Sequence, residues 1–361
     1  MRKSKRIAAI ALIASLGLVA AACSDDEKTE STTAATTAET TGETTAETTG
    51  DTTPMADITG GVAFDTGGRG DGTFNDSAGV GADRAVDELG MDITELEANV
   101  DEDREANLRL LAEDGRNVIV GVGFMFTDPM AAVAAEYPDI TFGIVDSVVD
   151  APNVRSLVFA EHEGSFLVGA AAALKCGCDK IGFIGGQEID LIKKFEAGYT
   201  AGAKHINPDI TVEVAYLGPA GDNSAWGNVA GAKEIAAGWY ADGVEVIYTA
   251  AGGSGAGTIQ AAIEAGKWAI GVDSDQYVTS GDPAAQAVIL TSMLKRVDVA
   301  VFETFKAVAE GDTEGGIKVF DLSVDGVGYA TSGDYLTDYI DQLEEIKQMI
   351  IDGEIEVPEA P

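Results

Sequence analysis

The chain has 361 residues and a formal net charge of −38, with 61 acidic against 23 basic side chains. This excess of carboxylates excludes the basic footprint that a nucleic-acid backbone requires, so we expect no nucleic-acid partner. There are only two histidines, and the cysteines are a single Cys-x-Cys pair and Cys23, so we expect neither a metal site nor a cofactor.

The N-terminus has the pattern of an export signal. Basic residues occupy four of the first six positions, an apolar run covers 7–22, and Cys23 follows three alanines. The run is shorter than the ~20 residues that span a bilayer, which favours a signal peptide over 1–22. The segment before Cys23 resembles a bacterial lipobox, with Ala20 where leucine is more usual. That resemblance implies lipidation of Cys23 and a membrane anchor. The alternative is an ordinary signal peptide with a chance cysteine.

Residues 23–56 read as the lipidated cysteine followed by a tether. The segment is rich in Thr, Ala, Glu and Gly, and "TTAETTGETTAETTGDTT" repeats with a period of four. This repeat has no aromatic or large apolar residue, so it cannot bury enough surface to offset the entropy of ordering its backbone. We predict a disordered linker between membrane and domain.

The remaining stretch alternates short apolar runs with helical patterns, which is typical of parallel βαβ units. Its length favours two doubly wound α/β lobes over a single sheet. The expected helices include 75–89, 104–114, 195–205, 228–239 and 257–265. The expected strands are 61–65, 93–97, 117–123, 140–146, 154–159, 180–185, 211–217, 244–250, 268–273 and 287–291.

Aspartates, glycines and one phenylalanine lie at the carboxyl ends of the predicted strands. In doubly wound folds ligands bind at the carboxyl ends of the strands. A single aspartate at such a place is as often a helix cap or part of a turn, but several at successive strand ends indicate a binding site. The residues at these ends are Asp65, Phe124, Asp146, Gly252, Gly253 and Asp273.

The glycine-rich stretch "FDTGGRGDGTFNDSAGVG" (64–81) fits no phosphate-binding loop. It lacks the spacing of a dinucleotide fingerprint, it has no P-loop lysine, and the expected helix starts too late to meet a pyrophosphate. An adhesion function would depend on the tripeptide Arg69-Gly70-Asp71 alone, which is weak support.

The same stretch resembles the N-terminal signature of the basic membrane protein family, the substrate-binding lipoproteins of ABC transporters, many of which bind purine nucleosides. The similarity continues in order through six further blocks: "GVGFMFTDP" (121–129), "YPDITFGIVDS" (137–147), "VRSLVFAEHEGSFLVGAAAAL" (154–174), "KIGFIGGQEIDLIKKFEAGYTAGAKHINP" (180–208), "GVEVIYTAAGGSGAGTIQAA" with "AIGVDSDQ" (243–276), and "LTSMLKRVDVAV" (290–301).

The resemblance implies a role for individual positions. Phe74 matches the phenylalanine that stacks on the nucleobase, and Asn75 is the next residue of that motif. Asp273 matches the aspartate that holds the ribose hydroxyls. The other ligand contacts that the resemblance implies are Lys295, Asp65, Thr66, Gly252 and Gly253, with less defined roles for Asp146 and Phe124.

One departure concerns the second stacking residue. Many relatives carry "GSF" after the strand equivalent to 211–217, whereas this chain reads "YLGPAGDNSAWGN". Trp226 either replaces the missing phenylalanine or packs elsewhere, and the sequence leaves both open.

The resemblance also implies a hinged fold like that of type I periplasmic binding proteins. It gives a first lobe of 57–161 plus 277–311 and a second of 162–276 plus 312–361, with crossings near 161, 277 and 312. It further implies that a nucleoside closes the lobes and that the loaded, lipid-anchored protein docks on a membrane permease at the extracytoplasmic face.

Two alternatives remain. A glycosidase-type enzyme could use clustered carboxylates, but there is no nucleophile elbow or metal-ligand spacing, so we expect no catalysis. A sugar-binding or sensor protein of the same fold is harder to exclude, because sugar sites also combine aromatics with carboxylates. No Arg cluster follows the strands, so we expect nucleotides to be rejected. For Cys176 and Cys178, a tight disulfide and weak metal binding both stay open.

Overall fold

The structure, a computed structural model, describes residues 58–361. The predicted signal peptide, Cys23 and the tether lie outside the described residues. None of the described helices is both long and apolar enough to cross a membrane.

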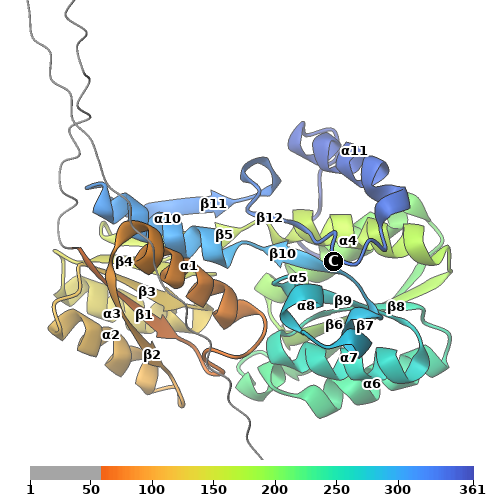
Figure 1. The fold of residues 1–361 in the computed structure, drawn as a ribbon, viewed down its shortest axis with the longest axis horizontal. Helices are drawn as coiled ribbons and strands as arrows, with labels where there is room; N and C mark the ends of the chain where they lie inside the picture. The colour runs from red at the N-terminus through yellow and green to blue at the C-terminus, as the bar shows by residue number, and fades with distance from the viewer. Residues whose placement is uncertain (1–57) are drawn as a thin grey trace, which may run out of the picture. The chain divides into compact units, whose positions relative to one another are not determined.

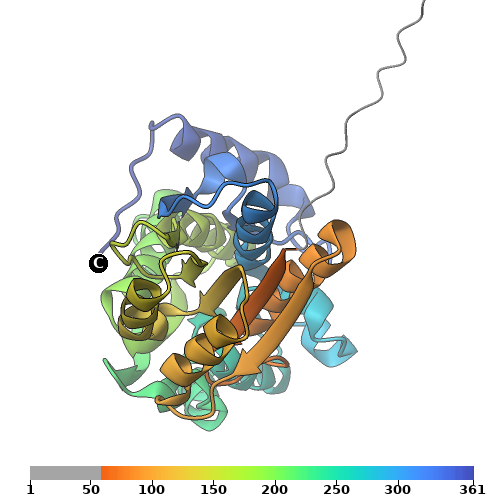
Figure 2. The same ribbon diagram turned by 90° about the vertical axis from the view of Figure 1, so that its left-hand side faces the viewer.

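The first lobe is built on a six-stranded parallel sheet with the order β11-β5-β4-β3-β1-β2. Its central strands are uniformly apolar because helices cover both faces, as Figures 1 and 2 show. Helices α1 and α10 pack together on one face, and α2 and α3 on the other. The elements are β1 (Thr59–Phe64), α1 (Phe74–Leu89), β2 (Asp92–Glu97), α2 (Asp103–Glu113), β3 (Val118–Val122), α3 (Thr127–Glu136), β4 (Thr141–Val145), β5 (Val154–Phe159), α10 (Val297–Ala309) and β11 (Gly316–Phe320).

The second lobe repeats this plan with the strand order β12-β10-β9-β8-β6-β7, in which only β12 is antiparallel to its neighbour. Helices α4 and α5 pack as one pair, α6 and α7 as another, and α11 lies against α4. The elements are α4 (Glu161–Cys176), β6 (Lys180–Glu188), α5 (Asp190–Ile206), β7 (Thr211–Pro219), α6 (Val229–Ala241), β8 (Val246–Ala250), α7 (Gly255–Ala265), β9 (Trp268–Asp273), α8 (Gln276–Thr279), α9 (Pro283–Gln286), β10 (Ile289–Lys295), β12 (Val327–Tyr329) and α11 (Ile340–Ile351).

The predicted fold class is confirmed, but two of the predicted lobe boundaries are wrong. The segment 277–311 does not belong to the first lobe as a whole, because β10 pairs with β9 in the second sheet and only α10 packs on α1. The segment 312–361 is divided as well, since β11 pairs with β5 in the first sheet. The chain therefore crosses between lobes after β5, between β10 and α10, and between β11 and β12.

Local patterns could not place these crossings. An apolar strand such as β10 suits either sheet, and its place is decided by the strands with which it pairs in the folded chain, β9 and β12. The expected strand, 287–291, also differs from β10, which begins at Ile289 and extends to Lys295.

Cys176 and Cys178, at the end of α4, form a disulfide with an S–S distance of 2.11 Å. Of the two possibilities that the sequence left open, the structure therefore contains the disulfide.

Candidate functional site

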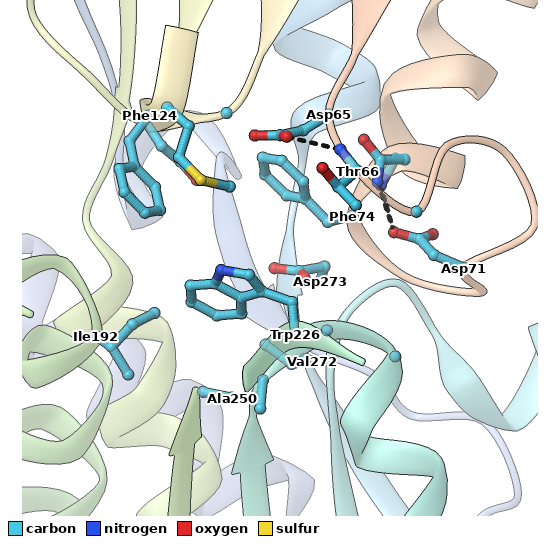
Figure 3. A pocket seen from close by; sticks show the side chains of 18 of the residues that line it. Asp65, Thr66, Asp71, Phe74, Phe124, Ile192, Trp226, Ala250, Val272 and Asp273 are labelled. Carbon is cyan, nitrogen blue, oxygen red and sulfur yellow. Dashed lines mark hydrogen bonds between the residues drawn. The ribbon is translucent and has the colours of Figure 1, made fainter. Parts of the chain in front are cut away.

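A pocket of about 560 Å³ lies between the carboxyl ends of the two sheets, a size typical of small-molecule sites. Phe74 and Phe124 extend into it from one side and Trp226 from the other (Figure 3). All eleven predicted contact residues line this pocket: Asp65, Thr66, Phe74, Asn75, Phe124, Asp146, Trp226, Gly252, Gly253, Asp273 and Lys295. Their roles toward a ligand stay predictions.

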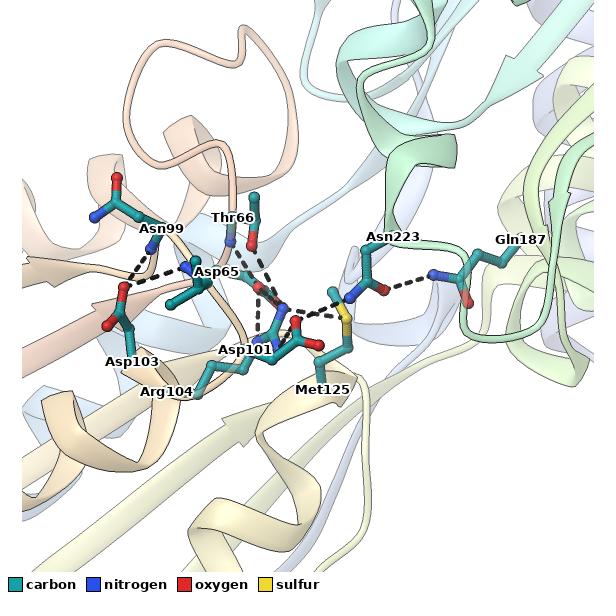
Figure 4. A network of polar contacts seen from close by, with 10 residues as sticks. Asp65, Thr66, Asn99, Asp101, Asp103, Arg104, Met125, Gln187 and Asn223 are labelled. Carbon is teal, nitrogen blue, oxygen red and sulfur yellow. Dashed lines mark hydrogen bonds and ion pairs between the residues drawn. The ribbon is translucent and has the colours of Figure 1, made fainter.

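Asp65 ends the first strand region and is held by a buried arginine that the sequence analysis missed. Its Oδ1 accepts hydrogen bonds from Nε and Nη2 of Arg104, at 2.9 and 2.7 Å, and from the backbone N–H of Thr66 at 2.6 Å (Figure 4). The Arg104 side chain is only 5% exposed. With Oδ1 saturated, Oδ2 is the oxygen that Asp65 can offer to a ligand.

Gly123 explains why the backbone can pass so close to this carboxylate. Its φ of +117° disfavours other residues, and a Cβ there would lie 3.2 Å from Asp65 Oδ2 and 3.6 Å from the Phe74 ring. A side chain at this position would crowd the Asp65 carboxylate, while its contact with the Phe74 ring would be an ordinary one.

The glycine-rich loop before α1 serves as a scaffold for the pocket. The carboxylate of Asp71 accepts bonds from the backbone N–H groups of Thr73, Asn75 and Asp76 and from the Asn75 side chain. Arg69 is bound within its own lobe, to Asp83, Glu95 and the Gly79 carbonyl. The tripeptide 69–71 therefore stabilises the loop and is not presented as a free adhesion motif.

Trp226 lies in the pocket, which answers one question that the sequence left open. Its ring meets Phe124 edge-on, with centroids 6.3 Å apart. It rests on bare backbone of β6, since a Cβ at Gly186 would lie 2.2 Å from the indole ring. A short 3-10 helix, Asn223–Trp226, carries it, and Asp222 caps that helix by accepting from the Ser224 N–H.

At the floor of the pocket one ammonium lies among three carboxylates, two of which line the pocket. Lys295 Nζ lies 2.6 Å from Asp146 Oδ1 and 3.2 Å from Glu161 Oε1, and all three side chains are buried. The buried carboxylate of Asp273 is the third. Nζ also lies 5.4 Å from the centroid of the Phe74 ring, within the range of a cation–π contact. The cluster therefore has more carboxylates than cations, which suits donors from a ligand and opposes a phosphate.

Burial and charge shift the titration of this cluster. Burial raises the pKa of Asp273 to about 7, because Lys295 only partly offsets the loss of solvent and the charges of Asp146, Asp71 and Glu161 add to it. Burial also raises the pKa of Glu161. For Lys295 burial alone would lower the pKa, but Asp146, Glu161 and Asp273 together raise it above its ordinary value.

Asp146 and Asp273 occupy equivalent places in the two lobes and share an unusual backbone. Both follow or end a central strand, β4 and β9, and both have positive φ values of 67° and 64°. Such a conformation costs a non-glycine residue on the order of 1–3 kcal/mol. The surrounding sheets hold both residues there, with both carboxylates at the pocket.

Several lining residues were not predicted. Ile192 and Phe195 come from the first turns of α5, a helix that the sequence analysis began at Phe195 and that begins at Asp190. Glu161 lies behind the pocket wall beside Lys295. The apolar pattern around 190–195 could have indicated that Ile192 and Phe195 line the pocket. Nothing in the sequence around Glu161, at the start of α4, indicated that this glutamate is buried. Gly252 and Gly253 line the pocket next to the Trp226 carbonyl, a neighbour that the sequence did not indicate.

A family model described as "ABC transporter substrate-binding protein PnrA-like" (Bmp) matches residues 58–360. The chain belongs to this family. Its curated relatives include the "ABC transporter nucleoside-binding protein BmpA" of Lactococcus lactis, 36% identical over 84% of this chain and 89% of that protein. The "CD4+ T-cell-stimulating antigen" of Listeria innocua is 35% identical over the whole of both chains.

Solved structures agree with this assignment. An ABC transporter solute-binding protein from Aeropyrum pernix superposes with a TM-score of 0.71 at 30% identity, over 83% of this chain and 94% of that one. One from Conexibacter woesei, at 22% identity and a TM-score of 0.69, covers 84% of this chain and 99% of that one and supports the fold. The Bmp family consists of substrate-binding proteins of ABC transporters, which are not enzymes.

Proposed function

We propose that this Bmp-family protein captures a nucleoside, with a purine as the base, between its two lobes and delivers it to a membrane permease. The observation that carries the proposal is the pairing in one pocket of Phe74 and Trp226, from different lobes, with the buried carboxylate of Asp273. Aromatic rings bind a base by stacking, at ~1–3 kcal/mol per base. A carboxylate binds vicinal hydroxyls by charge-assisted hydrogen bonds.

Asn75 supports a nucleobase as part of the ligand. Its side-chain N–H donates to Asp71, which fixes the orientation of the amide, and its Oδ1 is buried without a partner among residues 58–361. An oriented acceptor beside an aromatic ring suits an N–H group at the edge of a base. The relative from Lactococcus lactis, named as nucleoside-binding, is consistent with this ligand class.

The pocket also argues for a neutral ligand. Its only pocket-lining cation among the described residues is Lys295, which already pairs with Asp146 and Glu161. A phosphate would meet carboxylates that no cation compensates. The difference in binding free energy between a nucleoside and its nucleotide should therefore be far larger than the contribution of one hydrogen bond.

Calorimetry with adenosine, 2′-deoxyadenosine, inosine, guanosine, uridine, AMP and ribose tests this proposal. We expect binding of the purine nucleosides and no heat with AMP or ribose. Asp273→Ala should lose the preference for adenosine over 2′-deoxyadenosine, while Asp139→Ala, an exposed change outside the pocket, should retain it. Binding of ribose without any nucleoside would replace this function by that of a sugar-binding protein.

We also propose that the protein is held at the extracytoplasmic face of the cell membrane by lipid on Cys23. The N-terminal sequence supports this, and several relatives, such as one from Pyrococcus abyssi, are named lipoproteins. Labelling cells with a palmitate analogue should mark the wild-type protein in the membrane fraction. Cys23→Ser should lose the label and leave that fraction, whereas Cys176→Ser with Cys178→Ser should not. Retention of the label in Cys23→Ser would contradict the anchor.

A further inference from the structure

A continuous chain of hydrogen bonds joins the two lobes beside the pocket. Arg104, which holds Asp65, also donates through Nη1 to Asp101 Oδ1 at 2.8 Å. The same oxygen accepts a bond from Asn223 Nδ2, in the second lobe, at 3.1 Å. Figure 4 shows this line of contacts from Asp65 through Asn223 to Gln187.

Each end of the chain is held by a buried side chain. In the second lobe, Gln187 is 1% exposed; its Nε2 donates to Asn223 Oδ1 at 3.0 Å, and its Oε1 accepts the N–H of Gly221 at 2.8 Å. These bonds fix the Asn223 amide with its N–H₂ toward the first lobe. In the first lobe, buried Arg104 fixes Asp101 in the same way. The acceptor and donor that meet between the lobes are therefore preorganised.

The chain connects the two halves of the pocket. Arg104 orients Asp65, and Asn223 begins the 3-10 helix that carries Trp226. The Asp101–Asn223 contact therefore links the residue that orients Asp65 to the helix that carries Trp226.

We propose that Asp101 and Asn223 form a clasp between the lobes, with Arg104 and Gln187 as its positioning residues, and that this clasp slows release of the bound ligand. The contact lies at the surface, where the Asp101 side chain is 71% exposed. A hydrogen bond in water contributes modestly, so the expected effect is a change of about two- to tenfold in a rate.

Hydrogen–deuterium exchange of the protein without ligand tests the clasp itself. Asp101→Ala and Asn223→Ala should each speed amide exchange in both segments, 99–104 and 221–227, although the segments belong to different lobes. Glu102→Gln, which removes a neighbouring exposed charge, should change neither. Asp101→Asn retains an acceptor and should lie closer to the wild type. If each variant altered only its own segment, the clasp would be ruled out.

Release kinetics test the consequence, and this arm depends on the proposed nucleoside. Adenosine dissociation, followed by tryptophan fluorescence, should be about two- to tenfold faster in each variant with little change in association. The double variant should be no faster than the faster single one, because both remove the same contact. Unchanged release rates in variants that bind adenosine would overturn the proposal. If no nucleoside binds, the proposed function fails and the exchange experiment still decides the clasp.

Discussion

The two sides of the pocket are held together by different interactions. The aromatic side, with Phe74, Phe124 and Trp226, consists of half-buried rings that contact each other loosely and leave space between them. The floor around Lys295 is a buried charge cluster whose members depend on one another. We therefore expect that the rings can be changed with modest effects on the fold. A change in the charge cluster affects folding and binding together.

Replacing Lys295 by methionine should have the largest effect. It leaves the buried carboxylates of Asp146, Glu161 and Asp273 without their cation, and breaking a buried pair costs about 3–5 kcal/mol. We expect a loss of this order in the free energy of unfolding at pH 7.5, measured by urea denaturation. Lys306→Met removes an exposed pair with Glu303 and should cost less than about 1 kcal/mol. Equal effects in the two variants would contradict a mutually dependent cluster.

Phe74→Ala should weaken binding with little effect on folding, because the ring is only half-buried. We expect a loss of about 1–3 kcal/mol in adenosine affinity by calorimetry, the range of one stacking contact. The same substitution at Phe320, on β11 and outside the pocket, serves as the control and should leave affinity near that of the wild type. If Phe74→Ala bound adenosine as tightly as the wild type, Phe74 would not be a stacking residue.

A change of pH should affect the charged floor of the pocket and not its aromatic side, because only the floor contains a group, Asp273, with a pKa near neutrality. Below its pKa of about 7 the Asp273 carboxyl is protonated and accepts hydroxyl donors less well. Adenosine affinity should therefore fall by about tenfold for each pH unit below 7. If the ligand binds only the ionised carboxyl, each pH unit below the pKa adds ~1.4 kcal/mol to the free energy of removing its proton. Asp273→Asn should bind weakly at every pH, with a flatter profile. A pH-independent wild type would contradict the role of this group.

The raised pKa of Asp273 affects the stability of the fold in the opposite direction, so that stability increases as the pH falls while adenosine affinity decreases. A folded-state pKa above the ordinary 3.8 means that the folded protein binds more protons than the unfolded chain between these values. The contribution of Asp273 is therefore fully present below pH 4 and is lost as the pH rises to about 7. Denaturation without ligand should show Asp273→Asn gaining stability relative to the wild type at pH 8. A loss there would contradict the cost assigned to the buried carboxylate.

Trp226→Phe should have the smallest effect. The indole N–H has no hydrogen-bond partner among the described residues, so a phenyl ring can keep the contact. We expect a change in adenosine affinity below about 1 kcal/mol, against about 1–3 kcal/mol for Trp226→Ala. If Trp226→Ala bound adenosine as the wild type does, Trp226 would be a packing residue only.

The sequence by itself determined the alternation of strands and helices, and through ordered motifs the family. It also identified the residues that converge on the pocket. These features depend on local pattern and on short motifs, which a single chain carries explicitly. The predicted signal peptide and anchor also come from local composition, and they stay predictions.

The tertiary structure decided which sheet receives β10 and β11, and which side chains complete the site. Arg104 behind Asp65 and Glu161 beside Lys295 are contacts between distant segments, and nothing in the local pattern around them indicates burial. The placement of Trp226 in the pocket was settled in the same way, by the bare backbone at Gly186. Strand order and charge pairing are properties of the packed chain, because each depends on partners that only folding brings together.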